Sequence, residues 1–291
     1  MNLFGYIFFQ TFSFVCKVLP ARAAAALGCL IGLGMAALDK RRGRILRHMN
    51  YAVGHARARD LVGRYYEHMG LLAVEAGRID LYRPDNLHEW MEVEGLDRLQ
   101  RILARGKGAI FLTGHVGNWE LTGQALACLG LPLHVFIKPL KNPYLDRRLQ
   151  GLREQCGMRV HRKGSGMRWI IRLLRDGEAY GLMNDQDAGV DGEFFPFFGV
   201  EASTVTTAAR IARHAGAAIV PVTSYRLPCR TRSRLRIGPE VAVETGGEVG
   251  ADVYATTLRC NRALEEAILE HPAQWIWSHR RWRTRPSGDA R

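Results

Sequence analysis

The chain has 291 residues, of which 47% are hydrophobic, so it can bury a substantial core and its composition excludes an intrinsically disordered protein. Lysine and arginine outnumber the acids, which gives a net charge of 41 − 28 = +13 and predicts an anionic partner: nucleic acid, a phospholipid surface or an acidic protein. The six cysteines form no C-x-x-C pair, and their spacing excludes a zinc framework or disulfide scaffold and favours reduced thiols.

The first forty residues are strongly apolar. Residues 3–38 contain only two charged side chains, Lys17 and Arg22, and no acid. A basic cluster follows, beginning at Lys40 and ending at Arg47. An apolar segment before such a cluster is typical of a membrane anchor that keeps the next domain on the cytoplasmic side.

We therefore expect two parts, a helical membrane anchor over residues 1–39 and one domain over residues 40–291. The anchor either spans the bilayer or lies in its interface, and the sequence leaves this open. A buried helical hairpin is the alternative. A cleaved signal peptide is disfavoured, because the two residues before the apolar run include no lysine or arginine.

Beyond the anchor, short apolar runs alternate with amphipathic stretches. The expected strands are residues 108–113, 133–137, 179–183 and 217–222, with a shorter apolar run at 158–160. The expected helices are residues 60–78, 95–105, 119–129, 143–156, 166–176, 204–215 and 253–270. Strands that alternate with helices predict an α/β fold with a mainly parallel central sheet flanked by helices.

One expected strand ends in FLTGHVGNWE, in which His115 precedes Glu120 by five positions. On an unbroken helix such residues lie about 140° apart, so they act together only if the backbone turns between them. Gly114 and Gly117 permit that turn. At the carboxyl end of a strand, where open α/β sheets bind ligands, a histidine can act as a general base and a glutamate can orient its ring. The alternative is a surface turn with a glutamate at a helix N-terminus.

Two further features follow the expected strand 179–183. NDQDAG brings two acids, Asp185 and Asp187, to the same edge of the sheet, although a solvated turn explains them equally well. FFPFFG, a loop that includes Phe194 and Phe195, needs burial or an apolar ligand. An acyl-chain wall and a core plug both remain open for this loop.

Residues 138–175 hold eleven lysines or arginines against two acids. A solvated face is the usual explanation, but this run lies between His115 and Asp185, so we expect it to flank the same cleft. Arg162 is expected at the sheet edge. The tail, residues 275–288, mixes tryptophan with arginine, which suits a lipid headgroup interface. No nucleic-acid-binding motif accompanies it, so we expect no nucleic acid partner.

Several of these motifs, in this order, resemble the late acyltransferases of lipid A biosynthesis, the lauroyl/myristoyl transferase family of the H-x-x-x-x-D/E superfamily. The motifs are RRGRILRHMNYA, GHVGNWE, RVHRKGSGMRWIIRLLRDGE, NDQDAG, FFPFFG, TVTTAARIARHAGAAIVPV and WIWSHRRWRTRP. The resemblance implies a glycerolphosphate-acyltransferase-like fold and an enzyme of the bacterial inner membrane, with its catalytic domain on the cytoplasmic side. It implies transfer of a fatty acyl group from a thioester of acyl carrier protein or coenzyme A to a hydroxyl of a phosphorylated glycolipid, without metal or cofactor.

The resemblance also implies roles for individual residues. The family's histidine and glutamate fall on His115, expected as the general base, and on Glu120, expected to orient its ring. Backbone N–H groups of the turn 114–119, or Arg162, would stabilise the oxyanion. The residues expected to bind substrate are Asn118, Arg162, Asp185, Asp187, Phe194 and Phe195.

The chain departs from the family pattern at two places. Asn184 stands where the family usually has proline, and residues 51–57 lack the usual apolar–proline run. These departures leave the acceptor open: a phosphatidylinositol mannoside, an ornithine lipid or an aryl-polyene lipid is the alternative. Two rivals of other classes are a non-enzymatic, basic membrane-peripheral protein and a metal hydrolase that uses His115 with both aspartates.

Overall fold

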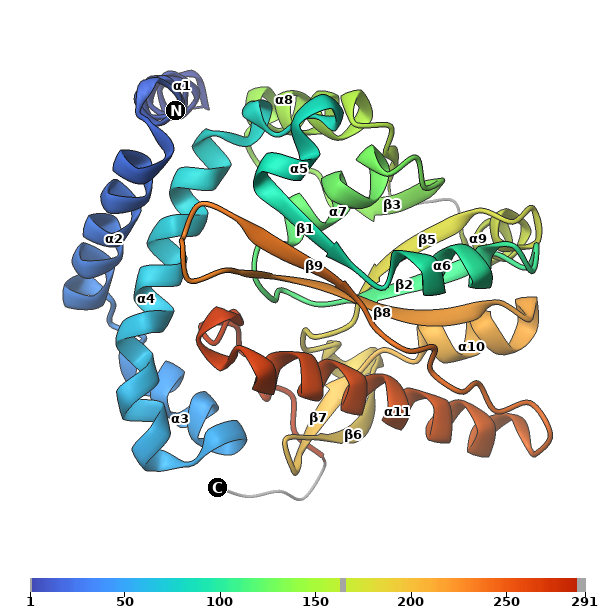
Figure 1. Cartoon of the computed structure of the whole chain (residues 1–291). Helices are drawn as coiled ribbons and strands as arrows, with labels where there is room; N and C mark the ends of the chain where they lie inside the picture. The colour runs from blue at the N-terminus through green and yellow to red at the C-terminus, as the bar shows by residue number, and fades with distance from the viewer. Residues whose placement is uncertain (1, 163–165, 287–291) are drawn as a thin grey trace.

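The computed structural model of the chain describes residues 2–162 and 166–286 (Figure 1). The helices are α1 (Asn2–Val18), α2 (Ala21–Leu38), α3 (Arg42–Val53), α4 (His55–Gly77), α5 (Leu87–Trp90), α6 (Leu96–Leu103), α7 (Trp119–Cys128), α8 (Pro143–Gln155), α9 (Gly166–Arg175), α10 (Thr207–Ala215) and α11 (Val249–Glu270). The strands are β1 (Met91–Glu94), β2 (Ala109–Thr113), β3 (Leu133–Ile137), β4 (Arg159–Arg162), β5 (Ala179–Met183), β6 (Glu193–Phe197), β7 (Val200–Thr204), β8 (Ala218–Arg226) and β9 (Ser233–Ile237).

The strand β2 lies in the middle of a seven-stranded sheet of order β1-β9-β8-β2-β5-β3-β4. Neighbouring strands run parallel, except that β8 and β9 form an antiparallel hairpin. This arrangement confirms the predicted α/β fold with a mainly parallel sheet flanked by helices.

Both faces of β2 are buried, because its side chains alternate between two cores. Ile110 and Leu112 pack with α9, α10 and α11, whereas Ala109 and Phe111 pack with α6 and α7 on the other face. In the parallel register the last residues of β2 and β5 face each other, Thr113 beside Met183. The segments that leave these two strands therefore begin at the same edge of the sheet.

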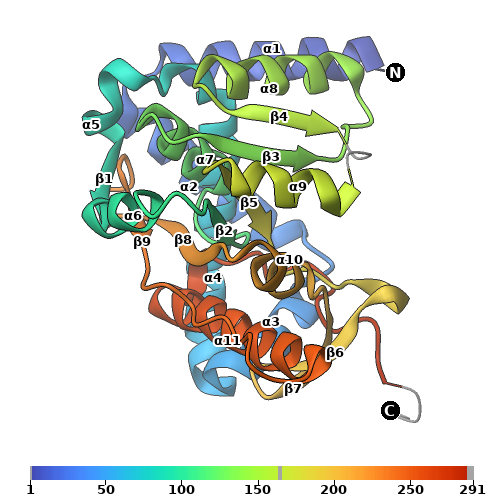
Figure 2. The same ribbon diagram turned by 90° about the vertical axis from the view of Figure 1, so that its right-hand side faces the viewer.

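The N-terminal helices α1 and α2 pack along α4, and α1 also lies beside α8 (Figures 1 and 2). Glycines allow the backbones of α2 and α4 to approach closely: a Cβ added to Gly70 would lie 2.0 Å from the carbonyl oxygen of Gly28. The outer face of α2 exposes Leu30 and Leu33. Within the described residues, α2 is the helix long and apolar enough to cross a bilayer, at 18 residues or roughly 27 Å. Its other face packs against α4.

The aromatic segment FFPFFG forms a hairpin of β6 and β7, which corrects the expected loop. Phe198 and Gly199 connect the strands with φ of +51° and +72°, as in the two-residue turns that suit hairpins. The edge strand β1 and its neighbour β9 lie outside the expected strands, and β8 continues four residues beyond the expected end at 222.

Candidate active site

The turn between β2 and α7 carries His115. Its backbone needs glycine at Gly117, which has φ of +58° and where a Cβ would lie 1.9 Å from the carbonyl oxygen of Ser224. Segment 274–276 secures this turn: Gly117 N donates to the Gln274 carbonyl at 2.8 Å, and Ile276 N donates to the His115 carbonyl at 3.2 Å. Two remote parts of the chain thus fix the histidine's backbone.

Asp185, from the segment after β5, is the side chain that holds the His115 ring. Its Oδ1 lies 2.9 Å from His115 Nδ1, and its Oδ2 accepts from the His115 backbone N–H at 2.6 Å. The same Oδ2 accepts from Trp275 Nε1 at 2.7 Å. Gly114 makes room for this contact, because a Cβ there would lie 3.0 Å from the Asp185 carboxyl carbon. The side chain of Asp185 is completely buried.

The environment keeps Asp185 ionised. Burial on its own would raise the pKa of Asp185, but the charge of His115 and the hydrogen bonds from His115 and Trp275 outweigh burial and hold that pKa below its usual range. An ionised carboxylate only accepts hydrogen bonds, so Nδ1 of His115 carries the proton. The lone pair is then on Nε2, as a general base requires.

The His115 ring meets two further side chains. The Nε2 of Gln186, an exposed residue, lies 3.2 Å from His115 Nε2. The Trp119 ring contacts the imidazole edge-on, with ring centroids 4.8 Å apart. The His115 side chain keeps 15% of its surface exposed, so its base nitrogen is accessible to a small group.

Glu120 does not orient His115, which corrects the expected pairing. It belongs to the first turn of α7, and its carboxylate binds Arg153 of α8 through two contacts, 2.5 Å from Nη2 and 3.0 Å from Nε. The helix begins at Trp119, so the side chain of Glu120 points to α8 and not back across β2. Its five-residue separation from His115 was the misleading signal.

Arg162 lies away from His115, contrary to expectation. It ends β4, which is three strand spacings from β2, or roughly 14 Å. Its side chain is 57% exposed, and its guanidinium contacts Asp146 at 3.1 Å.

Other cations of the 138–175 run are also paired, with acids that the sequence does not bring near them. Arg148 pairs with Asp80 at 3.1 Å, and Arg159 pairs with Glu178 at 2.8 Å. These contacts reduce the charge of the run, because four of its cations, Arg148, Arg153, Arg159 and Arg162, pair with carboxylates of the protein.

The structure also separates the roles of the two aspartates. The Asp187 carboxylate accepts from the backbone N–H and hydroxyl of Thr284, at 3.2 and 3.0 Å, so it secures the C-terminal segment. A metal hydrolase would need both aspartates beside His115, and only Asp185 contacts it. Among the described residues, no group of three or more potential ligands is placed to hold a metal ion.

The phenylalanines of the β6–β7 hairpin belong mainly to the core. Phe195 is fully buried and stacks on Tyr254 of α11, with ring centroids 4.8 Å apart. Phe197 packs against Trp275, the residue that binds Asp185. Phe195 thus fits the core plug, one of the two possibilities that the sequence left open, whereas Phe194 is half-buried.

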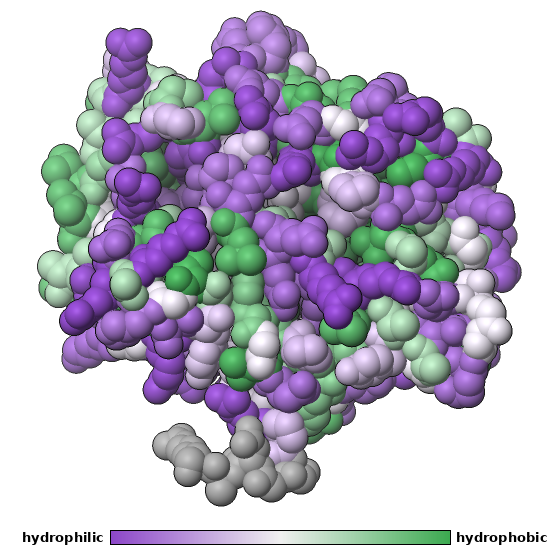
Figure 3. Space-filling model, turned by 60° about the horizontal axis from the view of Figure 1, so that its bottom comes forward, coloured by the Kyte–Doolittle hydropathy of each residue, from purple (hydrophilic) through white to green (hydrophobic). Residues whose placement is uncertain are grey.

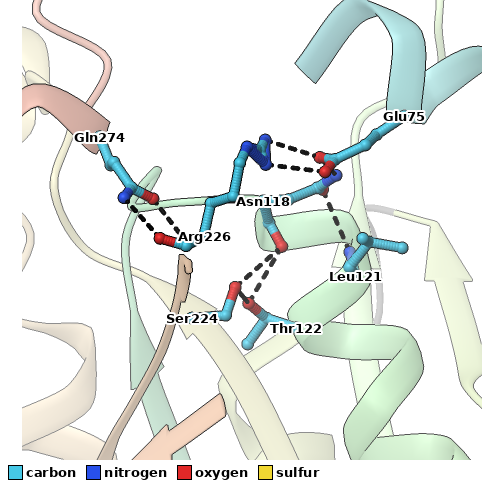
Figure 4. Close-up of polar contacts among 7 residues, drawn as sticks. All are labelled: Glu75, Asn118, Leu121, Thr122, Ser224, Arg226 and Gln274. Carbon is cyan, nitrogen blue, oxygen red and sulfur yellow. Dashed lines mark hydrogen bonds and ion pairs between the residues drawn. The ribbon is translucent and has the colours of Figure 1, made fainter. Parts of the chain in front are cut away.

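A buried polar network lies behind the His115 turn (Figure 4). Asn118 caps α7 by accepting from Leu121 N, and its amide donates to Glu75 at 2.7 Å. Two hydrogen bonds of 2.7 and 2.8 Å join Arg226 to the Glu75 carboxylate. Burial raises the pKa of Glu75, although Arg226 and Asn118 oppose that shift. Asn118, which the sequence analysis expected to bind substrate, caps the helix that follows His115 and is held by Glu75.

Sequence reasoning missed several residues of this site. Glu75 was detectable as the lone acid in the apolar stretch LLAVEAG, because a buried carboxylate needs a partner. Trp275, Gln186 and Arg226 gave no comparable signal.

An apolar cavity of about 220 Å³ lies next to this turn, between α1, α4, α7 and α8; we call it the apolar pocket. Its lining residues are Phe9, Leu72, Ala76, Ile79, Asn118, Trp119, Glu120, Leu140, Leu145, Arg148, Leu149 and Leu152. Because Trp119 lines this pocket and also contacts His115, an apolar chain in the pocket would end near the histidine. The arrangement suits a base that acts on a group attached to such a chain.

The geometry agrees with comparisons with known proteins. The chain matches the family of bacterial lipid A biosynthesis acyltransferases over residues 3–284. It is 30% identical over 281 residues to the lipid A biosynthesis palmitoleoyltransferase of Escherichia coli K12, covering 94% of this chain and 89% of the relative. It is 29% identical over 282 residues to the lipid A biosynthesis lauroyltransferase of that strain, covering 93% and 88%. It is 28% identical over 215 residues to the phosphatidylinositol mannoside acyltransferase of Mycolicibacterium smegmatis, covering 72% and 67%. The chain therefore belongs to the bacterial lipid A biosynthesis acyltransferase family and is an acyltransferase.

Proposed function

We propose that this acyltransferase moves a fatty acyl group from a thioester to a hydroxyl of a lipid A precursor, with His115 as the general base. The observation that carries the proposal is the His115–Asp185 pair, whose imidazole ring contacts Trp119 in the wall of the apolar pocket. Relatives named as lipid A acyltransferases support the acceptor class.

The reaction needs no covalent enzyme intermediate, because a thioester is already activated. His115 Nε2 removes the acceptor hydroxyl proton as the oxygen attacks the thioester carbonyl carbon. Asp185 stabilises the imidazolium that forms. The tetrahedral intermediate then expels the thiolate, which takes the proton from the imidazolium. The products are an oxygen ester and a free thiol.

The developing oxyanion needs a donor. The backbone N–H groups of His115 and Gly117 already donate, to Asp185 and to the Gln274 carbonyl. The side-chain amide of Gln186 lies within 3.2 Å of the base nitrogen, and we assign it this role.

The donor's acyl chain lies in the apolar pocket, which is lined mainly by leucines and other apolar side chains. The carrier is acyl carrier protein or coenzyme A. A net charge of +13 favours either anionic carrier through long-range attraction.

The enzyme works at the cytoplasmic face of the bacterial inner membrane, with α1 and α2 lying in the interface. The large apolar side chains exposed on α1 are Leu3, Phe4, Ile7, Phe8, Phe14, Val15 and Val18. Because α2 packs along α4, which carries charged residues throughout its first half, an interfacial position avoids taking those charges into the hydrocarbon.

A second acceptor, a phosphatidylinositol mannoside, is favoured by the 28% identity to an acyltransferase of that name. It leaves the base and the apolar pocket unchanged and alters only the headgroup.

The test is transfer by the purified full-length protein in neutral detergent. Acyl-carrier-protein and coenzyme A thioesters are offered with a phosphorylated glucosamine disaccharide lipid or with a phosphatidylinositol mannoside, and products are identified by mass spectrometry. We expect a new ester on the disaccharide lipid. Acylation of the mannoside alone would replace the acceptor, and no ester on either lipid would reject the proposed function.

A further inference from the structure

A second and larger cavity, about 860 Å³, lies between α3 and the C-terminal segment, residues 280–285; we call it the basic pocket. Figure 3 views this side of the molecule, where hydrophilic side chains cover much of the surface. One wall carries Lys40, Arg41, Arg44 and Arg47. The facing wall carries Arg280, Arg283 and Arg285. Two ends of the chain thus bring seven cations around one hollow.

Some of these cations are held by aspartates. Arg41 pairs with Asp39 at 2.8 Å, and Arg283 Nε lies 3.7 Å from Asp187. Neither aspartate lines the pocket, and among the described residues no carboxylate does.

Four of the other cations are not paired with a carboxylate of the described chain. There, no carboxylate lies within ion-pair distance of Lys40, Arg44, Arg47 or Arg280, and the Nε of Arg44 is buried without a hydrogen-bond partner. Like charges gathered around a cavity repel one another, so an anion bound between them is strongly favoured. Guanidinium groups bind phosphate through two parallel hydrogen bonds, which makes arginine the preferred partner of phosphate.

The pocket also has an aromatic surface. The rings of Tyr51 and Trp282 meet edge-on at 5.0 Å, and His48 packs against Trp282 at 4.9 Å. Burial lowers the pKa of His48 to about 4, so this ring is neutral near pH 7. A sugar ring can pack on this apolar surface while its phosphates meet the cations.

The basic pocket is connected to the catalytic pair through the C-terminal segment. Asp187, which binds Thr284 next to Arg283, is two residues from Asp185, at most about 7 Å along the chain. A headgroup in the pocket is therefore close enough to present a hydroxyl to His115.

From the cavity and its charges we propose that the basic pocket binds the phosphate groups of the acceptor's sugar headgroup, an inference that rests on the proposed function. Its volume is within the 300–1,000 Å³ usual for small-ligand sites. A flat membrane surface would be met by cations on a protruding face, whereas these surround a cavity. We therefore assign the pocket to the acceptor and not to bulk anionic phospholipid.

The test measures binding and not turnover, so that it succeeds or fails separately from the proposed function. The probe is the water-soluble, deacylated glucosamine disaccharide bisphosphate, titrated calorimetrically into full-length protein in neutral detergent micelles. Arg44→Gln/Arg47→Gln removes two cations of one wall. Arg57→Gln/Arg59→Gln, at exposed positions of α4, makes the same charge change outside the pocket. Arg280→Gln probes the facing wall independently, in case the first variant fails to fold.

We expect the α3 pair to weaken probe binding at least tenfold, Arg280→Gln to weaken it several-fold, and the α4 pair to leave it unchanged. Removing both phosphates from the probe should abolish binding. Adding phosphatidylglycerol to the micelles should leave the probe's affinity within twofold. Equal weakening by both double variants, binding without phosphates, or displacement by phosphatidylglycerol would each overturn the proposal, the last in favour of a membrane lipid site.

Discussion

The apolar pocket and the basic pocket differ in whether their charged lining residues are paired with an opposite charge of the protein. In the apolar pocket Glu120 and Arg148 are each neutralised by a protein partner, Arg153 and Asp80. In the basic pocket most cations have no carboxylate partner among the described residues. A wall whose charges are already paired favours an uncharged chain, and a wall with unpaired cations favours an anion. The comparison supports our proposal that the acyl chain and the phosphorylated headgroup occupy two different pockets.

The largest expected effect comes from removing His115, which lines neither pocket and contacts the Trp119 wall of the apolar one. His115→Ala should lower the transfer rate by about 10²-fold or more, because no other described side chain takes the hydroxyl proton. Probe binding to the basic pocket should persist, since His115 does not line it. Initial rates and calorimetry on the same preparation check both parts. Transfer close to that of the unmodified protein would reject the assigned base.

The next largest effect distinguishes the role of the Asp185 carboxylate from that of Glu120. Asp185→Asn should lower kcat by roughly 10²-fold, because a neutral amide neither fixes the ring tautomer nor stabilises the imidazolium. Glu120→Gln should mainly raise the donor's KM, because Glu120 lines the apolar pocket and neutralises Arg153.

Steady-state kinetics of both variants separate kcat from KM. If Glu120→Gln lowered kcat as strongly as Asp185→Asn at unchanged KM, the orienting role would return to Glu120.

A smaller effect concerns the length of the acyl chain. Ala76→Phe in α4 should fill part of the apolar pocket and shift preference towards shorter donors, by about tenfold in relative kcat/KM. Ala56→Phe, an exposed position on the same helix, is the matched control. A series of thioesters of increasing chain length measures the shift. An unchanged length profile in Ala76→Phe would place the acyl chain outside this pocket.

Much of the fold could be predicted from local pattern, because buried parallel strands are short apolar runs whatever surrounds them. Strands β2, β3 and β5 lie within a residue of their expected bounds. The partner of His115 could not be predicted in this way. Asp185 is 70 residues away and is selected by the register of β2 against β5, whereas Glu120 is near only in sequence.

The location of the unpaired positive charge could not be predicted from local sequence either. Net charge predicted an anionic partner, but the densest cationic run, residues 138–175, has many cations paired with distant acids. Four further cations without a carboxylate partner in the described chain surround one cavity where α3 meets the C-terminal segment, a contact between opposite ends of the chain. Which cations remain free depends on tertiary pairing, and composition carries no information about that.

The smallest expected effect concerns His48, the imidazole in the wall of the basic pocket. Its Nδ1–H donates to the Trp277 carbonyl at 3.1 Å, and burial lowers its pKa to about 4. In the unfolded chain the pKa of a histidine is near 6.5. Between pH 6.5 and 4 the imidazole of His48 is therefore protonated in the unfolded state but neutral in the folded state. The folded state loses stability as the pH falls through this window. His48→Asn keeps a donor near Trp277 and removes the titration.

The difference in melting temperature between the unmodified protein and His48→Asn should therefore shrink as pH falls through this window. We expect a decrease of a few degrees, since a change of roughly 1 kcal/mol in the free energy of unfolding shifts the melting temperature by about 2–4 °C. His88→Asn, at an exposed position, is the control, because it removes an imidazole that is not buried. Thermal unfolding at closely spaced pH values checks the prediction. A difference that stayed constant or grew on acidification would mean that His48 is charged in the folded enzyme. The basic pocket would then carry eight cations, which would make its contrast with the apolar pocket sharper still.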